Sequence, residues 1–303
     1  MADADAIYTV DSFTASDGYC WRYRRYLARQ GTERVPPRAH VVCLHGVQSH
    51  AGWFDYSCTK LSQAGFEVSF LDRRGSGMNQ EGRGDAPSYV RLLADVSEFL
   101  KQLRTTSAGL QSPLPIFVVA ISWGGKIATA LERWQPGCAD GLVLLCPGFF
   151  PRVRLPWRTR LGIAWARLRS PERLFSIPLN DPELFTASSR WQDFLRSDSR
   201  SLHRATARFL IESIRLDHYL RGTPNYVRVP VLLLLAEKDR IIDNAATRRF
   251  VEKFAGPDKQ VLEYAGAHHT LEFEPDPDRF LADVQAWLET HLSACPPKRG
   301  QDS

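Results

Sequence analysis

Short apolar runs alternate along this chain with longer segments whose apolar residues recur at helical spacing. Strands are predicted at 39–45, 67–71, 115–121, 139–146, 229–236 and 260–265, with intervening helices at 51–64, 88–104, 123–134 and 276–292. Strands that alternate with helices form a mostly parallel central sheet covered by helices on both faces. The predicted fold class is therefore α/β. A turn signal at 16–18 adds an antiparallel hairpin of residues 7–14 and 19–28 at one sheet edge.

The alternation stops after Pro147 and Gly148 and resumes only at residue 229. Residues 149–225 contain no convincing strand, several prolines and many arginines. They are interpreted as a mainly helical cap inserted into a core of residues 1–148 and 226–294. The last residues, 295–303, are expected to be a disordered tail.

The strand predicted at 115–121 breaks at Ser122 and restarts as a helix. Ala120 and Gly124, two residues either side, are small enough for strand and helix to pass closely, as in the G-x-S-x-G nucleophile elbow. Alanine replaces the first glycine of that motif. The same stretch resembles a phosphate loop, but it lacks the first glycine and has Ile127 where a magnesium-binding hydroxyl is required. An ordinary strand-to-helix turn remains the alternative on this motif alone.

Two later segments supply an acid and a histidine in the order Ser, acid, His. Asp239 follows the buried strand 229–236; Asp243 is a second candidate, although its position before a helical segment favours a capping role. His268 and His269 follow the strand 260–265, and spacing alone leaves open which of them is the base.

These motifs resemble those of the monoacylglycerol lipase and lysophospholipase branch of the α/β-hydrolase superfamily, also grouped with the serine aminopeptidase S33 hydrolases. The resemblance runs nearly end to end. It includes His45-Gly46 at the end of an early strand and the D-x-R-G-x-G pattern of residues 72–77. A serine that normally follows this pattern is replaced by Asn79.

The resemblance implies the α/β-hydrolase fold and a Ser122, His269 and Asp239 triad, in which the carboxylate orients the base. The backbone N–H groups of Val47 and Trp123 would form the oxyanion hole. The activity implied is hydrolysis of carboxylic esters through an acyl-enzyme, on small acyl esters such as a monoacylglycerol or a lysophospholipid. No cofactor is needed.

Two other residues of the family motifs, His45 and Asp72, are expected to brace loops near the site. His268, His269 and Glu272 do not predict a metal site, because no other Cys or His cluster completes a ligand set.

Two alternatives to an esterase stay open. Tryptophan after the nucleophile also occurs in proline iminopeptidase-like relatives, which suggests an exopeptidase whose cap acids would bind an amino terminus. The candidate acids are Glu172, Asp181, Glu183 and Asp193. The other alternative is a non-catalytic, ligand-binding hydrolase scaffold, which the complete set of Ser, His and Asp disfavours.

The cap contains two helical candidates. In the first, Trp157, Leu161, Trp165 and Leu168 lie near one face with arginines on the flanks. Such a face can touch a membrane surface transiently or pack onto the core, and packing is the favoured interpretation. The second candidate runs from Asp198 to Leu220. Residues 175–185 are expected to form a loop.

Charge and cysteine usage narrow the partners and the location. The net charge of +5 is modest, and no basic stripe interleaved with aromatics indicates nucleic acid. The amino terminus lacks a signal-peptide pattern. The six cysteines are scattered and are interpreted as reduced, buried thiols in a cytoplasmic protein. Nothing in the sequence indicates an oligomeric state.

Overall fold

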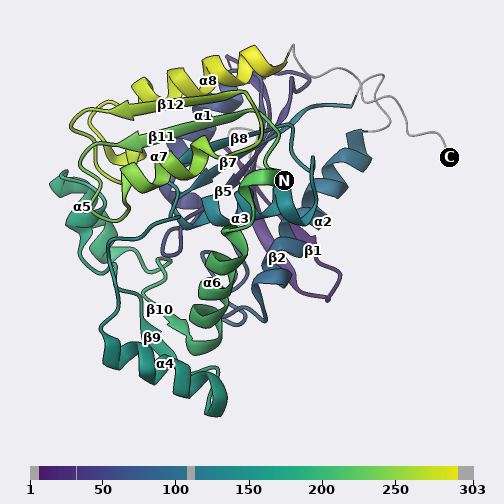
Figure 1. Ribbon diagram of the computed structural model, residues 1–303. Helices are drawn as coiled ribbons and strands as arrows, with labels where there is room; N and C mark the ends of the chain where they lie inside the picture. The colour runs from purple at the N-terminus through teal and green to yellow at the C-terminus, as the bar shows by residue number, and fades with distance from the viewer. Residues whose placement is uncertain (1–6, 32, 108–112, 293–303) are drawn as a thin grey trace.

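A computed structural model describes residues 7–31, 33–107 and 113–292. Its centre is an eight-stranded sheet in the order β1-β2-β6-β5-β7-β8-β11-β12 (Figure 1). The strands are β1 (Thr9–Thr14), β2 (Cys20–Tyr26), β5 (His40–Leu44), β6 (Glu67–Leu71), β7 (Ile116–Ile121), β8 (Gly141–Leu145), β11 (Val231–Ala236) and β12 (Lys259–Tyr264). From β6 to β12 all neighbours are parallel, whereas β1, β2 and β6 pair antiparallel. The predicted α/β class and the amino-terminal hairpin are confirmed.

Helices cover both faces of this sheet (Figure 1). The core helices are α1 (Asp55–Gln63), α2 (Tyr89–Ser107), α3 (Trp123–Trp134), α7 (Asn244–Glu252) and α8 (Asp278–Leu292). Helix α1 contacts α8 on one face, and α2 contacts α3 on the other. Every residue of β5, β6, β7, β8 and β11 is buried, because each of these strands is covered on both sides. A minor two-stranded sheet joins β3 (Arg29–Gln30) to β4 (Glu33–Arg34).

Residues 149–225, here called the insert, leave the sheet after β8 and return before β11. The insert contains α4 (Trp157–Arg169), β9 (Leu174–Ser176), α5 (Ser189–Ser197), β10 (Arg204–Thr206) and α6 (Ala207–Leu220). Helix α6 rests on α2 and α3, and α4 packs on α6 far from the sheet (Figure 1).

Three predictions for the insert were wrong. Strands β9 and β10 pair with each other, although no strand was expected. The helix predicted from Asp198 to Leu220 begins only at Ala207, because the chain is extended through β10 and the Thr206 hydroxyl then caps α6 by accepting from the Phe209 N–H. The segment 175–185, expected to be a loop, contributes to β9 and ends in a short 3-10 helix at Pro182–Leu184.

The apolar face of α4 does not pack onto the core, which overturns the favoured interpretation. Trp157, Leu161, Trp165 and Leu168 are 66%, 61%, 61% and 78% exposed. They lie within about 80° of one another around the helix. The opposite side, with Ile163 and Ala166, is the one buried against α6.

Four of the cysteines in the described residues are buried free thiols, namely Cys43, Cys58, Cys138 and Cys146. Cys20 is also free but exposed, so the expectation that the cysteines are buried was wrong for that residue. Cys295 and the predicted disordered tail, 295–303, lie outside the described residues. Across the described ranges, no helix is long and apolar enough to cross a membrane.

Candidate active site

Ser122 stands at the turn between β7 and α3 in a backbone conformation that side chains rarely adopt. Its φ is 51° and its ψ is −120°. The strained turn is held by backbone hydrogen bonds from the Ser122 N–H to the Leu145 carbonyl (2.9 Å) and from the Gly148 N–H to the Ser122 carbonyl (2.8 Å). A Cβ on Gly124 would lie 2.5 Å from the Leu44 carbonyl oxygen, so only glycine allows α3 to pass β5 this closely. The hydroxyl of Ser122 therefore projects above the carboxyl edge of the sheet.

The structure brings the three residues of the predicted triad together from three loops. His269 Nε2 lies 2.9 Å from Ser122 Oγ, and His269 Nδ1 lies 2.7 Å from Asp239 Oδ2. The ring of His269 and the carboxylate of Asp239 are almost completely buried, whereas Ser122 is partly accessible. A base bonded to both a hydroxyl and a buried carboxylate can accept the serine proton.

The alternative acid and base candidates lie elsewhere. His268 turns away from Ser122, since its N–H and Nδ1 both contact Glu274 Oε1, at 2.9 and 3.1 Å. Asp243 caps α7 by accepting from the Ala246 N–H at 2.9 Å, as its position suggested.

Burial would raise the pKa of Asp239, but its contacts reverse the shift. The ring of His269 and the N–H groups of Ile241 and Ile242, both bonded to Oδ1 at 2.8 and 3.0 Å, favour the charged form. Together they hold the pKa of Asp239 below its usual value, so the carboxylate stays ionised and can stabilise a protonated imidazole.

The predicted oxyanion donors lie beside the nucleophile. Trp123 is the first residue of α3, where backbone N–H groups have no partner within the helix. Val47 lies in the loop after β5, and a Cβ on the preceding Gly46 would lie 3.3 Å from the Ser122 Cβ. Within the described ranges, neither the Val47 nor the Trp123 amide has a hydrogen-bond acceptor. Both are available for a negatively charged oxygen.

His45 and Asp72 brace the loops around the site, as the sequence analysis predicted. The Asp72 carboxylate accepts from the Ala51 N–H at 2.7 Å and from the Met78 N–H at 2.8 Å. Asn79, which replaces the usual serine, donates to the Asp72 carbonyl at 2.7 Å. This substitution therefore keeps a polar side chain tied to the same turn.

Cys146 is a neighbour of the triad that the sequence analysis did not identify. It directly follows β8 with a φ of 43°, and its thiol lies within 4.8 Å of one ring nitrogen of His269 and one carboxylate oxygen of Asp239. Burial and the adjacent Asp239 charge raise the pKa of the thiol, so it is a neutral packing group. These three residues are the one group in the described part of the chain with metal-ligand side chains this close together. Asp239 and His269 in this group are already hydrogen bonded to each other.

A cavity of about 400 Å³ lies between the loop after β5 and the insert. Gln48, next to Val47, forms part of its wall. The rest of the lining is mixed, with apolar and polar side chains, namely Trp53, Leu179, Pro182, Phe185 and Leu195, and Asn180, Arg196, Ser201 and His203. Phe185 also packs edge-on against the ring of His269, with 6.1 Å between ring centroids. The cavity is thus adjacent to the base and within the size range of ligand pockets.

The buried carboxyl group of Glu272, three residues after His269, should make the stability of the folded protein depend on pH. Burial raises its pKa to about 7 from an ordinary 4.5, despite hydrogen bonds from the Ser57 N–H and hydroxyl. Between pH 4.5 and about 7, Glu272 keeps its proton in the folded state, whereas the unfolded chain releases it. The contribution of Glu272 to the free energy of unfolding therefore falls as pH rises.

Glu272→Gln cannot titrate, and relative to wild type it should gain on the order of 3 kcal/mol of unfolding free energy between pH 4.5 and 8. Urea unfolding across this range measures the difference, with Glu289→Gln on the exposed face of α8 as the control. A difference between Glu272→Gln and wild type that does not change with pH would contradict the assignment.

Comparison with known proteins places these features in a family. Residues 35–276 match the sequence model of the family described as serine aminopeptidase, S33. The chain is 28% identical over 271 residues to a monoacylglycerol lipase of Mycolicibacterium smegmatis, covering 86% of this chain and 91% of that protein. It is 27% identical over 292 residues to lysophospholipase L2 of Escherichia coli, covering 89% and 84%.

Solved structures show the same fold. A soluble variant of the monoglyceride lipase of Saccharomyces cerevisiae, in complex with a substrate analog, superposes with a TM-score of 0.82 at 19% identity. The match covers 94% of this chain and 96% of that one. The overall fold of the chain is therefore a known one.

Proposed function

Because the chain belongs to the serine aminopeptidase S33 family of α/β-hydrolases, we propose that it hydrolyses carboxylic esters through Ser122, His269 and Asp239. The observation that carries the proposal is the continuous hydrogen-bonded path from Ser122 Oγ through His269 to Asp239. The relatives named as lipases and lysophospholipases support the reaction class.

The reaction consists of two acyl transfers. Ser122 Oγ attacks the ester carbonyl carbon while its proton passes to His269 Nε2. The N–H groups of Val47 and Trp123 stabilise the resulting oxyanion, a contribution of about 3 kcal/mol per donor in other enzymes. The alcohol leaves with the proton, and a water that His269 deprotonates releases the acid. Apart from that water, these steps use only groups of the chain and the substrate.

An apolar acyl chain is the proposed substrate feature. Five of the ten residues that line the cavity beside His269 are apolar, and they offer a surface on which a hydrocarbon chain can pack. A monoacylglycerol or a lysophospholipid is the proposed specific substrate, by analogy with what the relatives are named for. The insert is proposed to act as the cap that shapes this cavity.

The exopeptidase alternative needs a carboxylate in the insert that is free to bind the amino terminus of a substrate. The four candidate acids do not meet this requirement. Asp181 and Glu183 lie within 4.0 Å of Arg240. Glu172 and Asp193 are highly exposed and lie next to Arg208 and Arg196. These positions favour an esterase.

The test is turnover of p-nitrophenyl esters from acetate to palmitate beside an aminoacyl anilide, with Ser122→Ala as the blank. Ester turnover that depends on Ser122 is expected, and its dependence on acyl length would report the size of the cavity. Turnover of the anilide alone would assign a peptidase, and no turnover of either substrate would favour a binding scaffold.

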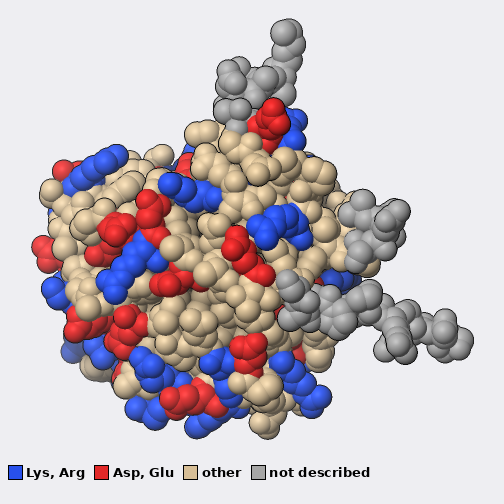
Figure 2. Space-filling view, turned by 90° about the horizontal axis from the view of Figure 1, so that it is seen from above, with Lys and Arg blue, Asp and Glu red and all other residues tan. Residues whose placement is uncertain are grey.

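Contact of α4 with an anionic membrane surface is the proposed way in which such an enzyme reaches lipid. The insert carries 14 arginines against 7 acidic residues, and no acid lies between Arg152 and Arg169. Arg158 and Arg160 lie on opposite flanks of the exposed apolar stripe of α4. By contrast, basic and acidic side chains are interspersed on the face over α8 (Figure 2). A bilayer containing anionic lipid complements both the apolar stripe and its basic flanks.

Replacing Leu161 and Trp165 with glutamate should lower the partition onto vesicles containing anionic lipid at least tenfold, since each buried side chain contributes about 1.5–3 kcal/mol. Flotation with neutral and anionic vesicles measures the partition, and hydrolysis of p-nitrophenyl butyrate should be unchanged. Equal partition of variant and wild type would contradict the proposal. A change in oligomeric state instead would assign the stripe to contact between copies of this chain.

The cytoplasmic location remains a prediction from the sequence.

A further inference from the structure

Two arginines follow one another in the turn after β6, and only the second is neutralised. Arg74 forms ion pairs with Asp95 at 2.6 Å and with Asp17 at 2.9 Å. For Arg73, no carboxylate oxygen of the described residues lies within 4.0 Å of the guanidinium. Burial lowers the pKa of Arg73 to about 10, with Asp72 opposing the shift, so the group is still a cation at neutral pH.

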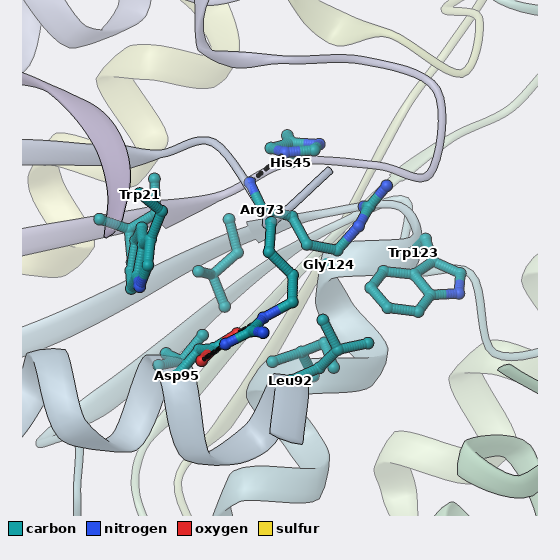
Figure 3. Close-up of a pocket in the computed structure, with 12 residues that line it drawn as sticks. Trp21, His45, Arg73, Leu92, Asp95, Trp123 and Gly124 are labelled. Atoms are coloured by element: carbon teal, nitrogen blue, oxygen red, sulfur yellow. Dashed lines mark hydrogen bonds and ion pairs between the residues drawn. The ribbon is translucent and has the colours of Figure 1, made fainter. Parts of the chain in front are cut away.

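The guanidinium of Arg73 is held by two carbonyl groups and two aromatic rings. Figure 3 shows Arg73 between His45 and Trp123. Nη1 donates to the Gly46 carbonyl at 3.3 Å and Nη2 donates to the Val47 carbonyl at 3.1 Å. Its central carbon lies 4.9 Å from the Trp123 ring centroid and 5.0 Å from that of Phe209. The cation is therefore fixed against both segments that supply the predicted oxyanion donors.

The Gly46 carbonyl oxygen belongs to the same planar peptide group as the Val47 N–H. A hydrogen bond accepted by the oxygen polarises that peptide group, and this strengthens its N–H as a donor. The cationic donor Arg73 thus acts on the Val47 N–H without touching the substrate.

A second donor converges on the same oxygen. The backbone N–H of Arg73 donates to His45 Nε2 at 2.9 Å, so His45 carries its proton on Nδ1, which donates to the Gly46 carbonyl at 2.6 Å. Burial and the Arg73 charge hold the pKa of His45 well below its usual value, so the ring stays neutral. Both the backbone and the side chain of Arg73 thereby orient one peptide group.

We propose that Arg73 is a positioning residue that orients and polarises the Gly46–Val47 peptide so that the Val47 N–H stabilises the oxyanion. The inference rests on the proposed function, because it assigns a role within that reaction. Its effect belongs to the transition state, in which the oxygen carries full negative charge, and not to binding of the neutral ester.

The test compares Arg73→Met, which removes charge and donors, with Arg73→Lys, which keeps the charge, and Arg73→Gln, which keeps a neutral donor. Arg133→Met is the matched control. Arg133 also donates to a backbone carbonyl, that of Tyr219 at 2.7 Å, and lies 4.3 Å from the Tyr219 ring centroid, but it is near the far end of α3. The readouts are kcat and KM for p-nitrophenyl butyrate and the inhibition constant of an alkyl trifluoromethyl ketone, whose adduct with a serine carries an oxyanion.

Arg73→Met should lower kcat about 30-fold, leave KM within threefold and weaken the ketone by a factor similar to the loss of kcat. Arg73→Lys should recover part of kcat, and Arg133→Met should change it less than twofold. If Arg73→Met does not fold, Arg73→Gln and Arg73→Lys decide by the same two readouts.

An unchanged kcat, or a loss confined to KM, would overturn the inference while leaving the esterase in place. A loss of kcat without weaker ketone inhibition would also overturn it. A wild type that turns over no ester would overturn the proposed function, and this role of Arg73 would fall with it.

Discussion

Ser122→Ala should lower kcat for ester hydrolysis by about 10⁶-fold, as loss of the nucleophile does in another Ser-His-Asp enzyme. The change deletes one hydroxyl and its hydrogen bond to His269, and it leaves the backbone bonds of the elbow intact. The thermal midpoint should therefore move little. Activity is measured with p-nitrophenyl butyrate at saturating substrate, and folding is measured by circular dichroism.

A Ser122→Cys variant serves as the partner of Ser122→Ala, because it keeps a nucleophile at the same place. It should retain more residual turnover than the alanine variant. Hydrolysis that persists in a folded Ser122→Ala protein would show that the path from Ser122 to Asp239 is not the catalytic apparatus.

His269→Ala should cause a loss of similar size, about 10⁶-fold in kcat, because the members of such a triad act as a unit. Without His269, no described side chain is hydrogen bonded to Ser122 Oγ that could take its proton. Removal of the ring also leaves a space beside Phe185, so a moderate drop in stability is expected.

The neighbouring residue is the matched control for that prediction. His268→Ala removes a histidine at the adjacent position, yet it loses only the contact of Nδ1 with Glu274. Its kcat should stay within about threefold of wild type, as expected for a residue outside the site. Loss of activity in His268→Ala but not in His269→Ala would reverse the assignment of the base.

The parts of the fold that were predicted correctly are those with strong local signals. Five buried strands consist almost entirely of apolar residues, and α3 begins and ends at Trp123 and Trp134, the boundaries expected from the elbow and its helix. The order of serine, acid and histidine along the chain is sufficient to predict the loops that meet at the site, since parallel strands end at one edge.

The insert was predicted less well for physical reasons. Strands β9 and β10 have three residues each, too few to show an alternating pattern. Asp198 was placed in a helix, but its carboxylate accepts from the Trp53 indole at 2.8 Å and from the Ser201 hydroxyl at 2.6 Å, and the chain continues without helix. The orientation of α4 depends on which side fits α6, and Ile163 and Ala166 decide it through contacts that are distant in sequence.

Details of the site beyond the triad were also not predictable from sequence patterns. The turn motif identifies residues 72–77 without indicating that Arg73 donates hydrogen bonds to the Gly46 and Val47 carbonyls, 27 and 26 residues earlier. The same applies to Cys146, whose proximity to Asp239 arises only when β8 and β11 pair.

The most direct test of the proposed chemistry is the mass of the protein after treatment with an alkyl fluorophosphonate. Attack of Ser122 Oγ on phosphorus expels fluoride and leaves a stable adduct, because the activated hydroxyl is a far better nucleophile than the other serines. The expected result is one adduct per wild-type chain, located on Ser122 by peptide mapping, and none in Ser122→Ala. An adduct on another residue, or equal labelling of Ser122→Ala, would contradict the assignment of Ser122 as the nucleophile.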